Sequence, residues 1–150
     1  MPQSFASVYL HVVFSTKNRA PFITPEITPR LYDYLAATAL GNETMILNVG
    51  GVADHVHLLL SFGREVTIAD TVRTLKGSSS RWVHDTFDEN QRFSWQAGYG
   101  SFSVGYPELG AVKAYIAGQA EHHQRETFQD EYRRLLIHNG RMWDERFVWD

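Results

Sequence analysis

The sequence predicts an α+β fold: a ferredoxin-like (RRM-like) antiparallel sheet with helices on one face and a further helix toward the C-terminus. The first observation is the order of patterns along the chain, which runs strand, helix, strand, strand, helix, strand and then helices. The second is that short runs rich in β-formers alternate with longer stretches at helical spacing. A sheet of this type leaves its second face free for a ligand or a partner.

The first half of the chain contains four regular segments. They are a strand over 9–15, a helix over 25–41, and strands over 44–49 and 54–62. Thr24 is a suitable helix cap because its hydroxyl can accept an unpaired amide of the first turn, and Pro25 fits the first helical position. Gly50-Gly51 separates the second and third strands, so we expect a bend or bulge there within a hairpin.

The second half contains two long helices, a broken strand region and a shorter helix. We expect a helix over 67–87, a strand region over 93–104, and helices over 108–124 and 128–137. Gly98 and Gly100 interrupt the strand region, and Asn139-Gly140 ends the last helix. The tail over 143–149 is aromatic and acidic, and we expect it to pack against the rest of the protein.

Length and composition indicate one domain over residues 1–150. Hydrophobic residues make up 43% of the chain, which is enough for a sizeable core. No apolar run approaches the ~20 residues that span a membrane, and residues 1–7 lack the pattern of a signal peptide. The chain has no cysteine, which excludes disulfides and thiolate chemistry and fits a cytoplasmic location.

The net charge of −3 counts against a protein that coats nucleic acid, because such proteins are usually basic. Local groups of basic residues can still contact a few phosphates. Two groups are present, Lys17 with Arg19 and Arg73 with Lys76 and Arg81. We take these five side chains as candidate DNA contacts, and ordinary solvated surface charge is the alternative.

The most informative pattern is His55-Val56-His57, which lies in an apolar run that reads as a buried strand. Side chains alternate along a strand, so the apolar residues point into a core while His55 and His57 point together to the other face. Two neighbouring imidazoles on a rigid strand form half of a divalent metal site. The alternative is a pair of structural histidines.

The helix over 108–124 supplies candidates for the rest of such a site. Tyr115, Gln119 and His122 have helical spacing and share one stripe of the helix. If this stripe meets the second face of the sheet, the Gln119 carbonyl can be a third metal ligand, with Tyr115 beside the metal. A phenolate there could attack phosphorus in a phosphodiester. Because the ordinary pKa of tyrosine is ~10, the metal or a base such as His122 must promote its ionisation.

Several segments, read together, carry a family resemblance. They are His11-Val12-Val13-Phe14, Gly51 to Leu59, Phe93 to Val104, Tyr115 to Gln119, Glu121-His122-His123 and Asp144 to Asp150. With these segments the chain resembles, nearly end to end, the IS200/IS605-type single-tyrosine (Y1) transposases of the HUH nuclease superfamily. An isolated HUH motif, where U is a bulky apolar residue, is a weak signal. The same motif followed by Tyr-x-x-x-Gln at this distance is a strong one.

The resemblance implies an enzyme that cuts and rejoins single-stranded DNA at the hairpin ends of a mobile element. It implies that His55, His57 and Gln119 hold Mg²⁺ or Mn²⁺, and that Tyr115 forms a 5′-phosphotyrosine linkage that a 3′-OH later reverses. It also implies a homodimer, in which the tyrosine helix completes either the site of its own subunit or that of the partner.

Three alternatives stay open. A host-domesticated or replication-initiator-like nuclease would use the same chemistry. A non-catalytic DNA-hairpin-binding module could stack bases on aromatics of the free sheet face, for which strand aromatics such as Tyr9, Phe93 and Trp95 are candidates. A structural zinc site would need a fourth ligand, for which Asp54 and His122 are candidates, and we also keep these two as auxiliary residues.

Overall fold

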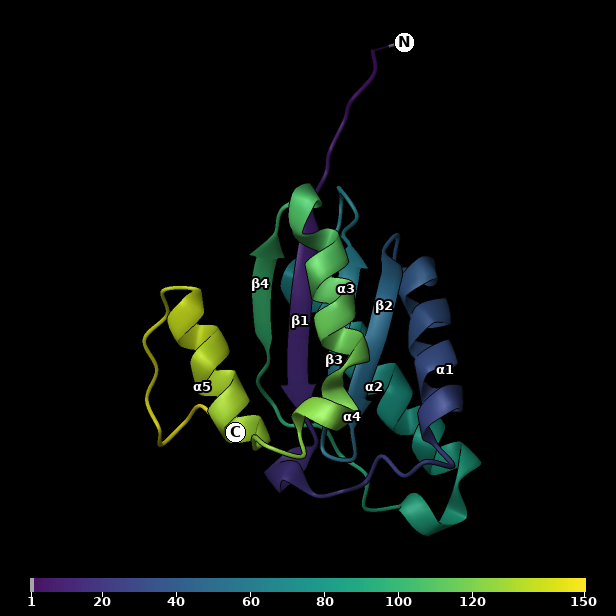
Figure 1. The fold of residues 1–150 in the computed structure, drawn as a ribbon. Coiled ribbons are helices and arrows are strands. Elements are labelled where there is room, and N and C mark those ends of the chain that lie inside the picture. Colours follow the sequence, from purple (N-terminus) through teal and green to yellow (C-terminus); the bar gives the residue numbers. More distant parts are fainter. Residues whose placement is uncertain (1) are drawn as a thin grey trace.

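The computed structural model describes residues 2–150 and contains the predicted ferredoxin-like fold (Figure 1). Four antiparallel strands form one sheet in the order β2-β3-β1-β4. Their bounds are β1 (Tyr9–Ser15), β2 (Met45–Val52), β3 (His55–Ser61) and β4 (Gly100–Val104). Helix α1 (Thr28–Gly41) connects β1 to β2, and helix α2 (Ile68–Thr86) connects β3 to β4. This arrangement confirms the predicted fold class.

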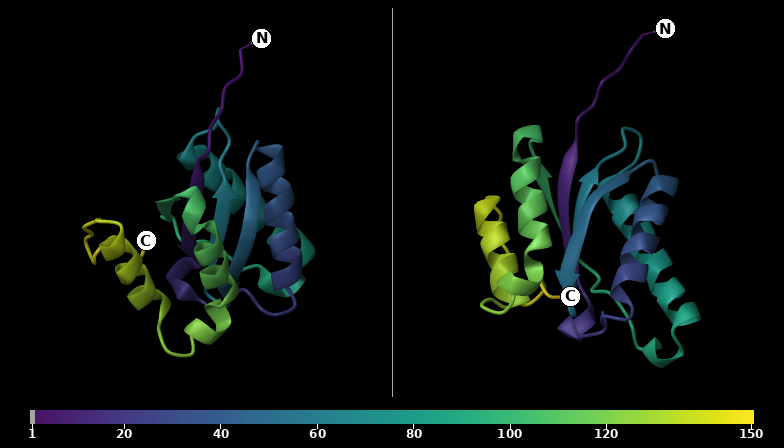
Figure 2. Two further views of the ribbon diagram at one scale, coloured as in Figure 1. Left: turned by 45° about the horizontal axis from the view of Figure 1, so that its top comes forward. Right: turned by 45° about the vertical axis from the view of Figure 1, so that its right-hand side comes forward.

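Short 3-10 helices lie in three of the connections: η1 (Lys17–Arg19), η2 (Asp88–Asn90) and η3 (Tyr106–Glu108). Helices cover both faces of the sheet. α1 and α2 lie on one side, whereas α3 (Leu109–Ala117), α4 (Gln119–His122) and α5 (Phe128–His138) lie on the other, as Figure 2 shows. The second face, which the sequence predicts to be free, is therefore covered by the C-terminal helices. Tyr115 belongs to this second layer.

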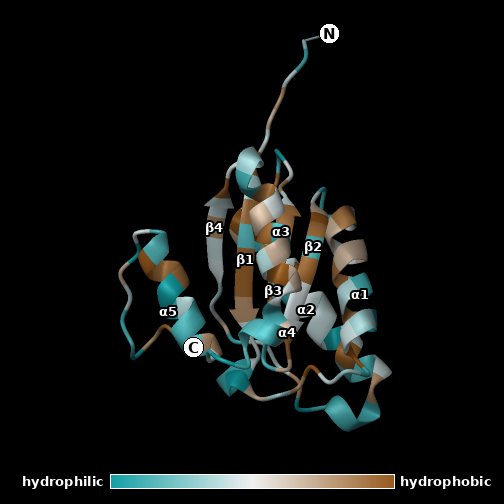
Figure 3. Ribbon diagram, viewed as in Figure 1, coloured by the Kyte–Doolittle hydropathy of each residue, from teal (hydrophilic) through white to brown (hydrophobic). Residues whose placement is uncertain are grey.

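The first face of the sheet carries the main apolar core. The strands contribute alternate buried side chains, Leu10, Val12, Phe14, Val56, Leu58 and Leu60. α1 adds Leu31 and Leu35, and α2 adds Val72 and Leu75. In Figure 3, stretches of β1 and β2 and parts of α1 are coloured as hydrophobic. Full burial of one such side chain contributes about 1.5–3 kcal/mol, so this packing supplies much of the apolar stabilisation.

Several element boundaries differ from the prediction. α1 begins at Thr28 rather than at Pro25, because residues 25–27 form a turn in which the backbone carbonyl of Thr24 accepts amides. The fourth strand is short, and in the segment before it Trp95 forms an isolated bridge with Thr16, the residue that follows β1. The helix expected over 108–124 is divided at Gly118 into α3 and α4.

The glycine pair of β2 has a different role from the predicted bend. Gly50 and Gly51 pair in register with His57 and Val56, and the irregularity of this strand lies instead between Ile46 and Asn48. A Cβ atom on Gly50 would collide with the backbone carbonyl of Ile116. The prediction of a bulge at the glycine pair was therefore wrong. The missing side chain lets α3 approach β2 closely, which brings the Tyr115 helix onto the sheet.

The C-terminal tail packs against the rest of the protein, as predicted, and it does so on the second face. Trp143, Val148 and Trp149 lie against a smaller apolar cluster that includes Val13 of β1 and Phe102 of β4. This cluster also contains the apolar side of α5, so it fixes that helix beside the strands that carry the histidines. Among residues 2–150, no helix combines the length and apolar character needed to cross a bilayer.

Candidate active site

The two histidines of β3 are buried side by side on the second face, as their alternation predicts. Nδ1 of His57 lies 2.7 Å from Nε2 of His11, which stands on the neighbouring strand β1. Burial, together with His57, lowers the pKa of His11 to about 3, so His11 is uncharged at neutral pH. His11 is absent from the predicted site residues. It holds the ring of His57 so that Nε2 of His57 faces the site.

His55 is held on both sides of its ring. Its Nδ1 lies 2.7 Å from Oδ1 of Asp54, and its Nε2 lies 3.1 Å from Oε1 of Gln119 at the start of α4. Burial disfavours the charged ring, but hydrogen bonds to Asp54 and Glu131 outweigh this effect and raise the pKa of His55 to about 9. The fold thus brings Gln119 to the histidine pair, with Asp54 beside it.

Two residues that the sequence analysis did not select, His123 and Glu131, join this cluster. Oε1 of Glu131 lies 2.9 Å from Nε2 of His123, 3.0 Å from Nε2 of His57 and 3.3 Å from Nε2 of His55. Burial favours the uncharged acid, yet the hydrogen bonds from the three imidazoles prevail and lower the pKa of Glu131. These four side chains offer ligand atoms that all lie within 4.8 Å of one another.

The signal for Glu131 is present in the pattern of α5. Phe128, Tyr132 and Leu135 are buried on one side of this helix, and Glu131 lies on the same side at helical spacing. A charged side chain on a buried stripe needs a partner, so it marks a site. His123 gives no comparable signal, because its position depends on the turn after α4.

Tyr115 meets the cluster at its hydroxyl group. The hydroxyl donates a short hydrogen bond to Oε2 of Glu131, and Nη2 of Arg134 donates to the hydroxyl oxygen at 3.0 Å. Oε2 of Glu131 also accepts from the side-chain amide of Gln119 at 3.1 Å. Burial and the nearby Glu131 raise the pKa of Tyr115, and Arg134 opposes this rise. The tyrosine is therefore a neutral phenol in this arrangement.

His122, the predicted base, pairs with a different group. Its Nε2 forms a close contact with a carboxylate oxygen of Glu126, and the same carboxylate accepts from Arg134 at 3.1 Å. The rings of His122 and Tyr115 have centroids 5.6 Å apart. His122 therefore lies beside the tyrosine, while Glu131 is the residue that accepts the hydrogen bond of its hydroxyl.

A hollow of about 730 Å³ opens next to the tyrosine, between β4, α3 and α5. His11, Tyr115, Arg134 and His138 line it together with apolar residues that include Phe102. Arg134 is about half exposed, so its guanidinium faces both the tyrosine hydroxyl and solvent. A phosphate that enters this hollow could reach the Tyr115 hydroxyl and Arg134 at the same time.

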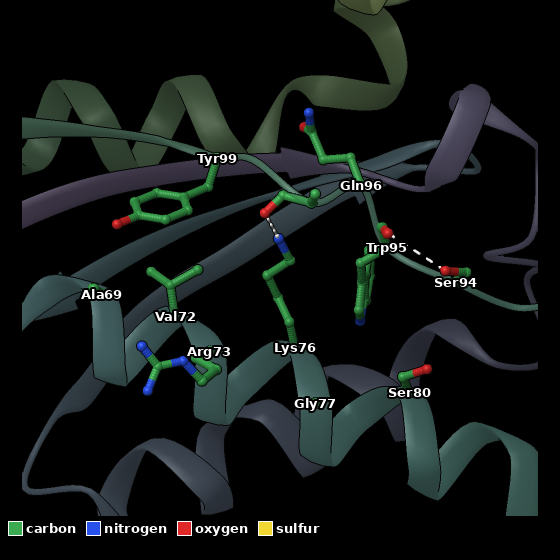
Figure 4. A pocket seen from close by; sticks show the side chains of 11 residues that line it. Ala69, Val72, Arg73, Lys76, Gly77, Ser80, Ser94, Trp95, Gln96 and Tyr99 are labelled. Atoms are coloured by element: carbon green, nitrogen blue, oxygen red, sulfur yellow. Dashed lines mark hydrogen bonds between the residues drawn. The ribbon is translucent and has the colours of Figure 1, made fainter. Parts of the chain in front are cut away.

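The basic residues predicted on α2 lie apart from this cluster, whereas Arg19 lines a hollow together with Asp54 and His123. Arg73, Lys76 and Arg81 stand on α2, on the first side of the sheet, where Arg73 and Lys76 line a hollow of about 440 Å³ (Figure 4). Nζ of Lys76 donates to the backbone carbonyls of Ala97 and Gly98, both at 3.0 Å, whereas Arg73 is exposed and pairs with Asp70. In η1, Lys17 is exposed and Arg19 lies near the ring of Trp149.

A ferredoxin-like sheet with a His-x-His pair on a central strand, beside a tyrosine and a glutamine from a following helix layer, defines the class of single-tyrosine transposases. The comparison with protein families supports the same conclusion. A family described as "Transposase IS200 like" matches residues 4–119. The chain therefore belongs to the IS200-like transposase family.

Individual relatives agree with this assignment. The chain is 31% identical over 85 residues to the ISDra2 transposase TnpA of Deinococcus radiodurans, an alignment that covers 57% of this chain and 61% of that protein. The chain therefore spans less than two thirds of that relative. It is 27% identical over 117 residues to the IS200 transposase of Salmonella typhimurium, covering 74% of this chain and 76% of that protein.

Two solved structures share the fold. One, from Deinococcus radiodurans R1 and assigned as a transposase, has a TM-score of 0.62 and 25% identity, covering 79% of this chain and 96% of that chain. The other is a REP-associated tyrosine transposase bound to a REP hairpin, with a TM-score of 0.57 and 13% identity, covering 82% and 74%. The family match ends at Gln119, so His123, Glu131 and Arg134 lie beyond it.

Proposed function

We propose that this protein cleaves and rejoins single-stranded DNA by transesterification, with Tyr115 as the nucleophile. Family membership supports action on DNA, and the proposal extends it to a mechanism. The observation that carries the proposal is that the Tyr115 hydroxyl shares the carboxylate of Glu131 with the imidazoles of His55 and His57. A tyrosine that only fills space would not need a hydroxyl in a buried cluster of titratable side chains.

In this mechanism the Tyr115 oxygen attacks phosphorus, and the bond from phosphorus to the 3′ oxygen breaks. The DNA on the 3′ side of the cleaved bond stays on the protein through its 5′ phosphate as a phosphotyrosine, and the DNA on the 5′ side leaves with a free 3′-OH. Oε2 of Glu131 accepts the hydrogen bond of the tyrosine hydroxyl, so it is placed to take the proton and to pass it to the departing 3′ oxygen. Attack by a 3′-OH on the phosphotyrosine reverses these steps, joins two DNA ends and returns the proton to Tyr115.

Arg134 has a positioning role in this proposal. Its guanidinium donates to the Tyr115 hydroxyl at 3.0 Å and remains about half exposed in the hollow beside it. A guanidinium can bind a phosphate oxygen in a bidentate manner while it stabilises the negative oxygen of the attacking phenolate. Arg134 would therefore hold the scissile phosphate against the tyrosine.

The residues at the centre of the cluster fit a divalent metal ion. Nε2 of His55, Nε2 of His57 and Oε1 of Gln119 all face the cluster, and neutral imidazole nitrogens and amide carbonyl oxygens are metal ligands. We propose that these three residues hold Mg²⁺ or Mn²⁺. When bound, the ion would neutralise negative charge on the phosphate during attack.

The proposed partner is a DNA hairpin at the end of a mobile element, and the proposed assembly is a homodimer. A fold neighbour of this chain was solved with a REP hairpin, which supports a hairpin as the ligand class. Within one chain, Tyr115 already meets His57, with ring centroids 5.8 Å apart. The proposal therefore assigns the tyrosine to the active site of its own subunit.

The test is a gel assay with labelled single-stranded DNA from the regions that flank this gene, in the presence of Mg²⁺ or Mn²⁺. The wild type should form a covalent protein–DNA adduct, and Tyr115→Phe should form none. Tyr106→Phe is the matched control, because Tyr106 is exposed in the neighbouring η3, and it should behave like the wild type. An adduct that persists in Tyr115→Phe would remove this residue as nucleophile. Tight binding without an adduct would favour the non-catalytic binding module.

A further inference from the structure

We propose that His123 and Glu131 are ligands of the metal ion, so that the chain after the Tyr115 helix completes the metal site. This inference rests on the metal site of the proposed function and adds two ligands to it. The resulting site has three imidazole nitrogens, a carboxylate and the Gln119 carbonyl. His123 follows α4 and Glu131 lies in α5, outside the segment that matches the family.

Each of the three imidazoles is held through its Nδ1 atom. Nδ1 of His55 faces Asp54, Nδ1 of His57 faces His11, and Nδ1 of His123 lies 2.7 Å from the backbone carbonyl oxygen of Glu126. Such contacts fix the ring and leave Nε2 for a metal, an arrangement that is general among metal-binding histidines. In this protein all three Nε2 atoms face the same carboxylate oxygen of Glu131.

His123 is oriented in the same way. The backbone carbonyl of Glu126 can only accept, so Nδ1 of His123 donates to it. Nε2 is therefore the ring nitrogen that faces Oε1 of Glu131, at 2.9 Å. One metal ion at this position would bind all three imidazoles and the carboxylate together.

Glu131 also lies where a carboxylate needs a partner. Its side chain is fully buried, on the side of α5 that otherwise carries apolar residues such as Phe128 and Leu135. A buried carboxylate is costly unless it is paired or coordinates a metal. The four candidate ligand atoms lie within 4.8 Å of one another, and opposite ligands of an ion with bonds of roughly 2.1 Å lie about 4.2 Å apart. A small contraction of the cluster is enough to bind one ion.

This ligand set also predicts which metal is preferred. Mg²⁺ favours oxygen ligands and retains water, whereas imidazole suits first-row transition metals. A site with three imidazoles should therefore bind Mn²⁺ much more tightly than Mg²⁺. A site limited to His55, His57 and Gln119 has two imidazoles and should discriminate less between the two ions.

The experiment measures Mn²⁺ binding to the full chain without DNA, by calorimetry, in the wild type, Glu131→Gln, His123→Asn and His57→Ala. We expect each substitution to weaken binding at least tenfold. Glu121→Gln is the matched control, because Glu121 is exposed, and it should bind like the wild type. Circular dichroism spectra establish that each variant is folded.

A second measurement needs no variant. Pulsed electron paramagnetic resonance of Mn²⁺ bound to the wild type counts the coordinated imidazole nitrogens, and we expect three. A count of two nitrogens would overturn this inference and leave the proposed function intact. The same conclusion would follow if folded Glu131→Gln and His123→Asn bound Mn²⁺ like the wild type while His57→Ala had lost binding. Unchanged Mn²⁺ affinity in His57→Ala as well would show that no metal binds here, and the metal-dependent mechanism would fail with it.

Discussion

On one face of β3, Leu58 and Leu60 pack against α1 and α2, whereas on the other face His55 and His57 meet Glu131 of α5. The two faces are built from alternate residues of the same strand. On the first face the partners are apolar, and one apolar side chain can replace another of similar volume and shape. On the second face each polar atom has a specific partner at a specific distance. This comparison predicts that the first face governs stability and the second governs chemistry.

The largest effect should come from a cavity in the first face. Leu58 is fully buried in the main core, so Leu58→Ala should lower the free energy of unfolding by about 2–5 kcal/mol, measured by chemical denaturation. Leu40→Ala is the control, because Leu40 is 62% exposed in α1, and it should change stability by less than about 0.5 kcal/mol. A loss of similar size in both variants would contradict the assignment of the core to this face.

A smaller effect should follow when His55, a proposed metal ligand on the second face, loses the carboxylate that orients its ring. Asp54→Asn removes the carboxylate that faces Nδ1 of His55, and it should weaken Mn²⁺ binding about 10–100-fold. Calorimetry measures the affinity, and Asp33→Asn, at an exposed position on α1, is the control. Equal affinity in both variants would mean that Asp54 does not orient the histidine.

The sequence predicts the apolar first face of the sheet almost completely. Period-2 alternation assigns Val56 and Leu58 to the core and His55 and His57 to the opposite face, and the structure agrees. The order of strands and helices predicts the sheet. These features are local or depend on general topology, so a pattern of residue types is enough to find them. The spacing of Tyr115 and Gln119 is local in the same way, and both side chains lie at the histidine pair.

The sequence does not predict which residues meet the histidines on the second face, because those partners come from elements far away in the chain. Glu131 meets His57 across 74 residues, and its approach depends on how α5 folds back over the sheet. The role of Gly50 likewise depends on the position of Ile116 in α3 rather than on any local turn. A single charged residue on an apolar stripe was the available signal for Glu131. Distances between elements could not be read from residue types.

The basic residues of α2 test whether the first side of the sheet also takes part in DNA binding, through the outer surface of this helix. If this surface contacts DNA, Arg73→Gln and Arg81→Gln should each lower the slope of log affinity against log salt by about 1. Lys76→Met should leave the slope unchanged, because the ammonium of Lys76 is already bound to two backbone carbonyls. Hairpin binding measured by fluorescence anisotropy at several salt concentrations distinguishes these results. An equal reduction in all three variants would place Lys76 on the DNA as well.

The smallest effect concerns the stability that Lys76 contributes as pH changes. Burial lowers the pKa of Lys76 to about 8 from an ordinary value near 10.5. Between these values the unfolded chain binds the proton more strongly than the folded protein does, so this residue makes the protein more stable as pH rises from 8 to 10.5. Partial exposure screens the group, which keeps the effect small. The difference in unfolding free energy between wild type and Lys76→Met should therefore shift in favour of the wild type over this range. If this difference in unfolding free energy does not change with pH, the two carbonyls keep the pKa of Lys76 at its ordinary value and burial does not lower it.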